Sequence, residues 1–163
     1  MKKLTTVFLI IISVLWSSQS FAQKLQSDEG NFSIEFPCTY QKESSEDEVQ
    51  TTHKFTCDKD NVTFFLGYTV HETEIYGHSD LAQVSVDSFL ETVGGEMVSQ
   101  EEWKILKNPG LKSVMTINDG AVLINYRVVL VDQNQYQLVV LAAKDDFDEK
   151  AAEKFFKSFK LEK

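Results

Sequence analysis

The densest group of side chains able to bind metals or transfer protons lies in one short stretch, residues 71–80. Imidazole and carboxylate groups are competent zinc ligands. The candidate metal ligands in this stretch are His71, Glu74, His78 and Asp80. A helical zinc-protease motif needs two histidines four residues apart, and Ile75 stands where the second would be. We therefore expect a polar loop, and metal binding or a small hydrolase remains an open alternative.

Two further residues stand out by their type and place. Arg127 is the only arginine of the chain, and it lies in the middle of a very apolar stretch. Such an arginine needs a carboxylate partner or an anionic ligand, and a structural pair with a carboxylate is the simpler expectation. Trp103, on a polar strand, is an interface anchor if exposed and core if it points inward.

Other catalytic patterns are absent from the sequence. A Gly-x-Ser-x-Gly nucleophile motif and a phosphate-binding glycine loop do not occur. His53 and Cys57 are four positions apart on a strand, about 13 Å by the rise per residue, which is too far for a nucleophile and its base. The 25 acidic residues offer many carboxylate pairs, but nothing singles one out. We expect no cofactor.

The first 22 residues have the three parts of a secretory signal peptide. Two lysines are followed by an apolar run over residues 7–16, which is too short to span a bilayer, and Ser20-Phe21-Ala22 supplies small residues for cleavage. We expect residues 1–22 to be removed and residues 23–163 to form one exported domain, periplasmic or secreted. Removing residues 1–22 takes away two lysines and no acidic residue, so the net charge changes from −9 to −11. Such a charge disfavours nucleic acids and anionic membranes as partners.

The remaining chain contains two cysteines, Cys38 and Cys57. An exported protein meets an oxidising compartment, so this spacing predicts one structural disulfide. A redox pair would more often be Cys-x-x-Cys, and no further ligands accompany these sulfurs to form a metal site.

Hydrophobic periodicity predicts an α+β domain in the order βββ-α-ββββ-α, with a mostly antiparallel sheet and two amphipathic helices. The expected strands are residues 31–36, 51–57, 61–70, 98–107, 111–117, 121–131 and 135–143, and the expected helices are residues 79–93 and 146–159. Strand 121–131 is apolar on both faces, which indicates a covered inner position, whereas the polar strand 98–107 indicates an edge.

Local signals predict the connections between these elements. The acidic residues 41–50 are typical of a solvated loop, and Asn108-Pro109-Gly110 is typical of a turn. Capping boxes are expected where Asp80 precedes Gln83 and where Asp146 precedes Glu149. Gly94 and Gly95 should end the first helix.

The opening Gly-Asn-Phe-Ser-Ile-Glu-Phe-Pro at residues 30–37 and the closing Ala-Glu-Lys-Phe-Phe-Lys-Ser-Phe at residues 152–159, with this element order, resemble the PsbP-like fold. Photosystem II extrinsic subunits and the Ran guanine-nucleotide release factor share that fold. Proteins with this fold share no catalytic residues, so the resemblance assigns none to this chain. It implies a non-catalytic binding or accessory module and does not identify the partner. For an exported chain we expect the partner to be another envelope or secreted protein. A carrier of an apolar ligand held between helix and sheet is a third alternative.

Overall fold

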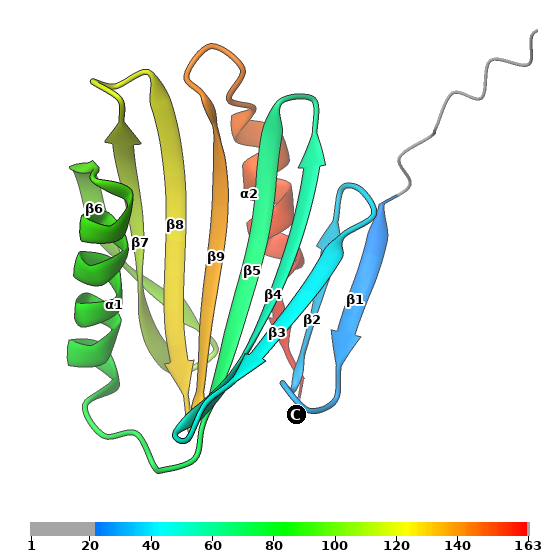
Figure 1. The fold of residues 1–163 in the computed structure, drawn as a ribbon, viewed down its shortest axis with the longest axis vertical. Coiled ribbons are helices and arrows are strands. Elements are labelled where there is room, and N and C mark those ends of the chain that lie inside the picture. The colour runs from blue at the N-terminus through cyan, green and yellow to red at the C-terminus, as the bar shows by residue number, and fades with distance from the viewer. Residues whose placement is uncertain (1–21, 163) are drawn as a thin grey trace, which may run out of the picture.

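The computed structural model describes residues 22–162, so residues 1–21 of the expected signal segment 1–22 lie outside them. The described part contains ten strands and two helices (Figure 1). Their bounds are β1 Gln23–Ser27, β2 Phe32–Phe36, β3 Gln41–Glu46, β4 Gln50–Lys59, β5 Val62–His71, α1 His78–Val93, β6 Glu96–Ile105, β7 Asn108–Ile117, β8 Val122–Val131, β9 Asn134–Ala143, α2 Glu149–Ser158 and β10 Lys160–Leu161.

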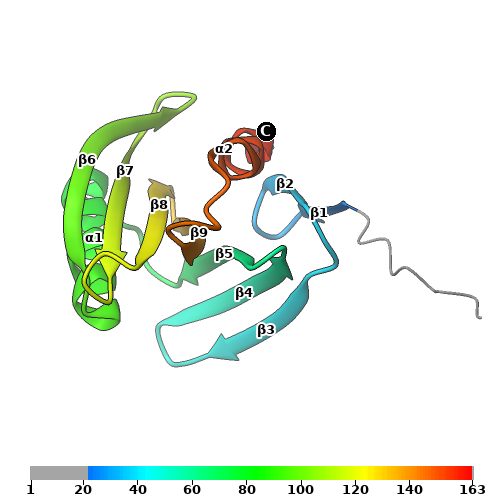
Figure 2. The ribbon, with the colours of Figure 1, turned by 90° about the horizontal axis from the view of Figure 1, so that it is seen from above.

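The strands form two antiparallel sheets. The large sheet has the order β3-β4-β5-β9-β8-β7-β6, and the small sheet has the order β1-β2-β10. Helix α1 covers one face of the large sheet, and α2 with the small sheet covers the other (Figure 2). The α+β class and the antiparallel sheet predicted from periodicity are confirmed.

Alternate side chains of strand β8 point to opposite faces of the large sheet. Its side chains at Ile124, Tyr126 and Val128 are buried against α1, whereas Val129 is buried in the core beneath α2. Both faces of the strand are therefore covered, as its apolar sequence predicts. The polar strand β6 lies at one edge of the large sheet, which confirms the edge position predicted for residues 98–107.

Both helices form where predicted, but their first residues are capped differently. In α2 the carboxylate of Asp148, not Asp146, accepts hydrogen bonds from the backbone of Lys150 and Ala151. Helix α1 begins after Gly77, which adopts a left-handed conformation, and within residues 22–162 no side chain caps it. The capping box expected at Asp80 is therefore wrong: a flexible glycine, not a side-chain oxygen, sets the chain direction there.

Three strands were not predicted, and each lacks the alternation of a half-buried strand. Residues 41–50 form β3, a turn and the first residue of β4 rather than one loop. The backbone of β3 pairs with β4, while all of its side chains stay exposed. Strand β1 has one buried side chain, Leu25, and β10 has two residues. Polar edge strands are held by backbone hydrogen bonds, which leave no hydrophobic signal in the sequence.

The turn expected at Asn108-Pro109-Gly110 lies two residues earlier. Leu106 and Lys107 connect β6 to β7, and residues 108–110 are already paired in β7. Gly110 is a glycine for a packing reason, because a Cβ there would lie 2.3 Å from the Val128 carbonyl oxygen. The glycine therefore permits a close approach of β7 and β8 instead of making a turn.

The core beneath α2 is mainly aromatic. Phe155 and Phe156 of α2 and Phe159 at its end are each at most 3% exposed. Cys38 and Cys57 lie at the edge of this core with their Cα atoms 5.9 Å apart, within the range that a disulfide requires. Cys38 follows β2 of the small sheet and Cys57 lies in β4 of the large sheet, so the packing of the two sheets, not the pairing of strands, brings the cysteines to this separation.

Candidate functional site

One row of charged residues crosses the large sheet on the face that α2 covers. Glu101 of β6 is paired in register with Lys112 of β7, and Lys112 is paired with Arg127 of β8. Directly paired residues of neighbouring strands point to the same face. Glu153 of α2 continues the row, because its carboxylate forms a short ion pair with Arg127.

Arg127 is enclosed by aromatic rings as well as paired. Its guanidinium carbon lies 4.1 Å from the centroid of the Phe156 ring and 5.6 Å from that of Trp103. Only 13% of the side chain is exposed. Burial lowers the pKa of Arg127, and the neighbouring Glu153 carboxylate raises it in opposition. An arginine remains cationic under such conditions, so this part of the site carries a fixed positive charge.

A hollow of about 180 Å³ opens beside this arginine, and we call it the Arg127 hollow. Its floor is formed by side chains of β6, β7 and β8, and one wall is formed by Glu149, Glu153 and Phe156 of α2. The sheet curls so that the β6–β7 turn bends toward α2 (Figure 2). Asn125 lines the hollow, and its buried side-chain amide oxygen has no hydrogen-bond partner among residues 22–162.

The hollow offers charges of both signs to a visiting molecule. Lys112 donates to Glu101 at 2.8 Å, and this contact lowers the pKa of the Glu101 carboxyl. Arg127 and Glu153 supply a second, less exposed pair. Charged groups beside an aromatic ring, here Phe156, are typical of protein interfaces, where arginine and aromatic residues are enriched.

Arg127 and Trp103 were singled out separately in the sequence, and the structure brings them together. Arg127 has its carboxylate partner, and Trp103 is half-buried on the edge strand beside it. The sequence argument missed Glu153 and Phe156. These two residues are three apart on α2 and therefore share a helix face, but without the sheet register nothing linked that face to Arg127.

The four candidate metal ligands do not converge. His71 ends β5, His78 is the first residue of α1, and the Glu74 carboxylate accepts a hydrogen bond from the Tyr76 hydroxyl. Within residues 22–162, no three histidine, cysteine, aspartate or glutamate side chains lie in a geometry that could hold a metal ion. An open hollow does adjoin this loop, lined in part by His78 and by Asp132 of the β8–β9 turn.

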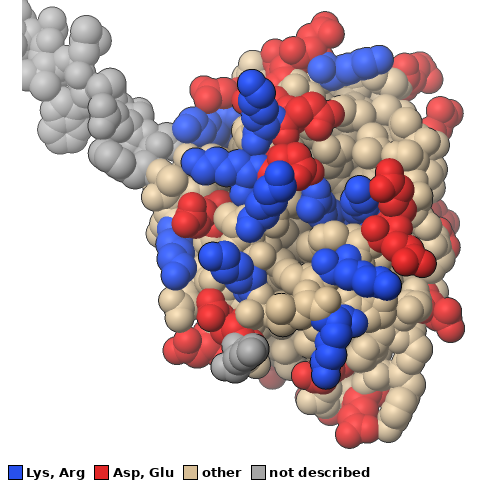
Figure 3. All heavy atoms as spheres, turned by 180° about the vertical axis from the view of Figure 1, so that it is seen from behind, with Lys and Arg blue, Asp and Glu red and all other residues tan. Residues whose placement is uncertain are grey.

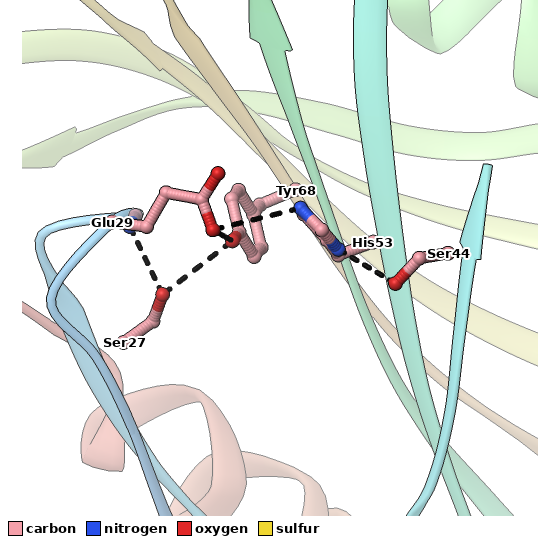
Figure 4. A network of polar contacts seen from close by, with 6 residues as sticks. Ser27, Glu29, Ser44, His53 and Tyr68 are labelled. Carbon is pink, nitrogen blue, oxygen red and sulfur yellow. Dashed lines mark hydrogen bonds and ion pairs between the residues drawn. The ribbon is translucent and has the colours of Figure 1, made fainter. Parts of the chain in front are cut away.

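A second polar cluster ties the small sheet to the large one (Figure 4). The Oγ of Ser44 lies 2.7 Å from Nδ1 of His53, and Nε2 of His53 lies 3.9 Å from the Glu29 carboxylate. The Tyr68 hydroxyl donates to the same carboxylate at 3.3 Å, and Ser27 donates to that hydroxyl at 3.5 Å. Burial is the main cause that raises the pKa of Tyr68.

Serine, histidine and glutamate in contact invite comparison with a hydrolase triad. In such a triad the serine contacts Nε2 and the acid contacts Nδ1, whereas here the two nitrogens are exchanged. Ser44 sits on an edge strand whose side chains are all exposed, so the serine is not enclosed as a nucleophile in an active site would be. We interpret the cluster as a set of polar contacts that holds the β1–β2 turn against strands β3 to β5. The sequence placed His53 on a strand but did not indicate its partners.

Comparison with solved structures identifies the fold. The solution structure of cyanobacterial PsbP (CyanoP) from Synechocystis sp. PCC 6803 matches with a TM-score of 0.61, 10% sequence identity, and coverage of 86% of this chain and 92% of that one. The fold is PsbP-like. A 1.50 Å crystal structure from Bacteroides thetaiotaomicron VPI-5482 also matches, with a TM-score of 0.52 and 14% identity, over 86% of this chain and 48% of that one.

The likeness to CyanoP confirms the PsbP-like resemblance inferred from the two ends of the domain. At 10% identity it shows the PsbP-like fold and does not transfer a function. No family model matches the sequence. A search of curated proteins finds no match either. In the described residues, neither helix is long and apolar enough to cross a membrane.

Proposed function

We propose that this chain is an exported, non-catalytic module with a PsbP-like fold that binds another exported protein in the Arg127 hollow. Export is supported by the signal-like sequence of residues 1–22 and by two cysteines at disulfide distance. The binding role is supported by the surface chemistry around Arg127.

The observation that carries the proposal is the position of Arg127 between Phe156 and Trp103 at the edge of an open hollow. A rigid, aromatic-stacked guanidinium has already lost most of its side-chain freedom, so a partner that contacts it loses less entropy on binding. Trp103 lies at the free edge of the sheet, where a partner can cover the exposed part of its ring.

Other roles have less support in the geometry. A metal-dependent hydrolase would need ligands that converge near residues 71–80. A carrier of an apolar ligand would need space between α2 and the sheet, and Phe155 and Phe156 fill that layer at 2% exposure each. The Arg127 hollow is smaller than the roughly 300 to 1,000 Å³ of typical small-molecule sites, which favours a protein side chain or loop as its occupant.

The test is site-specific photocrosslinking in the organism's own envelope fraction. A photoreactive residue at Ser99, which lines the hollow, should give one dominant adduct, and Trp103→Ala should reduce it strongly. The matched control is the same photoreactive residue at Glu43 on β3, the opposite edge of the sheet, where no such adduct is expected. Equal adducts at both positions, or an adduct indifferent to Trp103, would contradict the proposal.

A further inference from the structure

The outward face of α2 differs in charge from the protein as a whole. Lys150, Lys154 and Lys157 recur at helical spacing, so they lie along one face of α2, and Lys160 follows in β10. Figure 3 shows basic side chains gathered over this side of the molecule, with a few acidic ones among them. We call these four residues the lysine face.

Most of this positive charge is unpaired. Within residues 22–162, Lys157 contacts Glu153 at 3.7 Å with 76% of its side chain exposed, and the other three lysines have no ion-pair partner. The four lysines border an open, shallow hollow of about 540 Å³. The acidic residues that share this hollow are Glu35 and Glu153.

The net charge of −11 for residues 23–163 does not prevent this face from attracting an anion. At physiological ionic strength the screening length is about 8 Å, so a bound group responds mainly to the charges nearest to it. Four lysines against two carboxylates around one hollow leave a local excess of positive charge. The negative net charge of the whole chain therefore does not exclude an anionic partner at this face.

We infer that the lysine face docks an acidic segment of a partner protein, one rich in aspartate or glutamate. Two carboxylates interleaved with the lysines favour a partner of mixed charge over a continuous plane of phosphates. A helix that binds membranes turns its apolar side to the lipid, but the apolar side of α2 is already buried in the core. The exposed large hydrophobic residues lie elsewhere, on α1, β6 and neighbouring turns.

This inference rests on the proposed binding role and adds the chemistry of the partner. The lysine face and the Arg127 hollow lie on two sides of α2 and meet at Glu153. A single partner could therefore contact Trp103 at the sheet edge and the lysines beyond the helix. The two surfaces are tested by different substitutions, so failure of one is distinguishable from failure of the other.

The experiment measures binding of a fluorescein-labelled oligoglutamate peptide to the purified protein by fluorescence anisotropy, at about 0.05 M and 0.15 M salt. We expect binding that weakens as salt rises. The triple variant Lys150→Gln, Lys154→Gln, Lys157→Gln should bind about tenfold more weakly, because each exposed contact contributes a few tenths of a kcal/mol or more. The matched control neutralises three exposed lysines on other surfaces, Lys42, Lys54 and Lys104, and should change affinity less than about twofold.

Vesicles of phosphatidylcholine with phosphatidylglycerol test the competing occupant. Binding to the peptide that is lost only in the α2 variant supports the inference. Equal loss in both triple variants would show a general charge effect and overturn it, as would a peptide that does not bind. Binding to vesicles but not to peptide would assign the face to lipid instead. Trp103→Ala should leave peptide binding unchanged, which separates this surface from the Arg127 hollow.

Discussion

The central carbon of the Arg127 guanidinium lies over the Phe156 ring, 4.1 Å from the ring centroid. Arg127 belongs to β8 and Phe156 to α2, so this contact joins the last helix to the sheet. The Glu153 carboxylate, one helical turn before Phe156, holds the same guanidinium. The polar site and the packing of α2 are therefore coupled, and changes at Arg127 should affect both.

We predict that Arg127→Lys lowers the free energy of unfolding by about 1 to 2 kcal/mol, because an ammonium group cannot stack on two rings as a planar guanidinium does. The measurement is urea denaturation followed by tryptophan fluorescence. Lys112→Gln is the control in the same row of charges. It breaks a more exposed pair with Glu101 and should cost at most about 1 kcal/mol. Equal effects would show that the aromatic enclosure adds nothing.

A second prediction concerns Cys38 and Cys57. The double variant Cys38→Ala, Cys57→Ala should be less stable by about 3 kcal/mol in the absence of reductant, because the bond closes a loop with a sequence separation of 19. Urea denaturation of both proteins with and without dithiothreitol measures the difference. Reductant should destabilise the parent protein and leave the double variant unchanged. Two free thiols by mass in protein purified from an oxidising compartment would contradict the pairing.

Sequence patterns predicted the strands with an alternating apolar face and missed β1, β3 and β10, which bury at most one side chain each. Strand β5 alternates Val62, Phe64 and Leu66 toward the core, so its period is visible in the sequence. Strand β3 exposes every side chain and exists because its backbone pairs with β4. Strand β4 follows β3 across a turn, and only knowledge of the β3–β4 pairing would have distinguished β3 from a loop.

The candidate site could be predicted in its parts but not in its assembly. A lone arginine in an apolar strand implied a carboxylate partner, and Glu153 is that partner. Which of the 25 acids would fill the role depended on where α2 crosses the sheet. The acidic stretch 71–80 offered more ligand types than any other, yet a strand end, a loop and a helix start spread them apart.

A third prediction is cleavage between Ala22 and Gln23. Small residues at Ser20 and Ala22 satisfy the signal peptidase, and residues 7–16 are too short to anchor the chain across a bilayer. N-terminal sequencing of the exported protein should start at Gln23. Recovery of the Met1 form as the main species in the envelope would contradict it. Ala22→Asp, which places a charged residue at the cleavage position, should block processing.

A fourth prediction compares two neighbouring residues of α2. Phe155→Ala should lower the free energy of unfolding by about 3 to 5 kcal/mol, because its ring is 2% exposed and packs on Phe36 and Phe64. Lys157→Ala should cost only a few tenths of a kcal/mol, since its exposed pair with Glu153 is screened by solvent. Chemical denaturation measures both. A Phe155 variant as stable as the parent would mean that the α2 layer is packed differently from the structure.

The fifth prediction is a loss of stability at alkaline pH that is controlled by Tyr136. Burial is the main cause that raises the pKa of Tyr136 to about 12, from an ordinary value near 10. The folded state therefore keeps a proton that the unfolded state loses. The stabilisation is complete below pH 10 and is lost between about pH 10 and 12, by roughly 2 to 3 kcal/mol. Burial also raises the pKa of Tyr68 and of Tyr126, which act in the same direction.

Two tyrosine variants separate this titration from hydrogen bonding. The Tyr136 hydroxyl donates to the Gly30 carbonyl oxygen at 2.6 Å, so Tyr136→Phe should cost about 1 to 2 kcal/mol at pH 7 and reduce the alkaline loss. The buried hydroxyl of Tyr126 has no hydrogen-bond partner in the described part of the chain, so Tyr126→Phe should be neutral or stabilising at pH 7 and should also reduce the alkaline loss. Urea midpoints at pH 8 and pH 11 measure both effects. If the two variants lower the free energy of unfolding equally at neutral pH, the Tyr136–Gly30 hydrogen bond would contribute nothing to the junction between β9 and the small sheet.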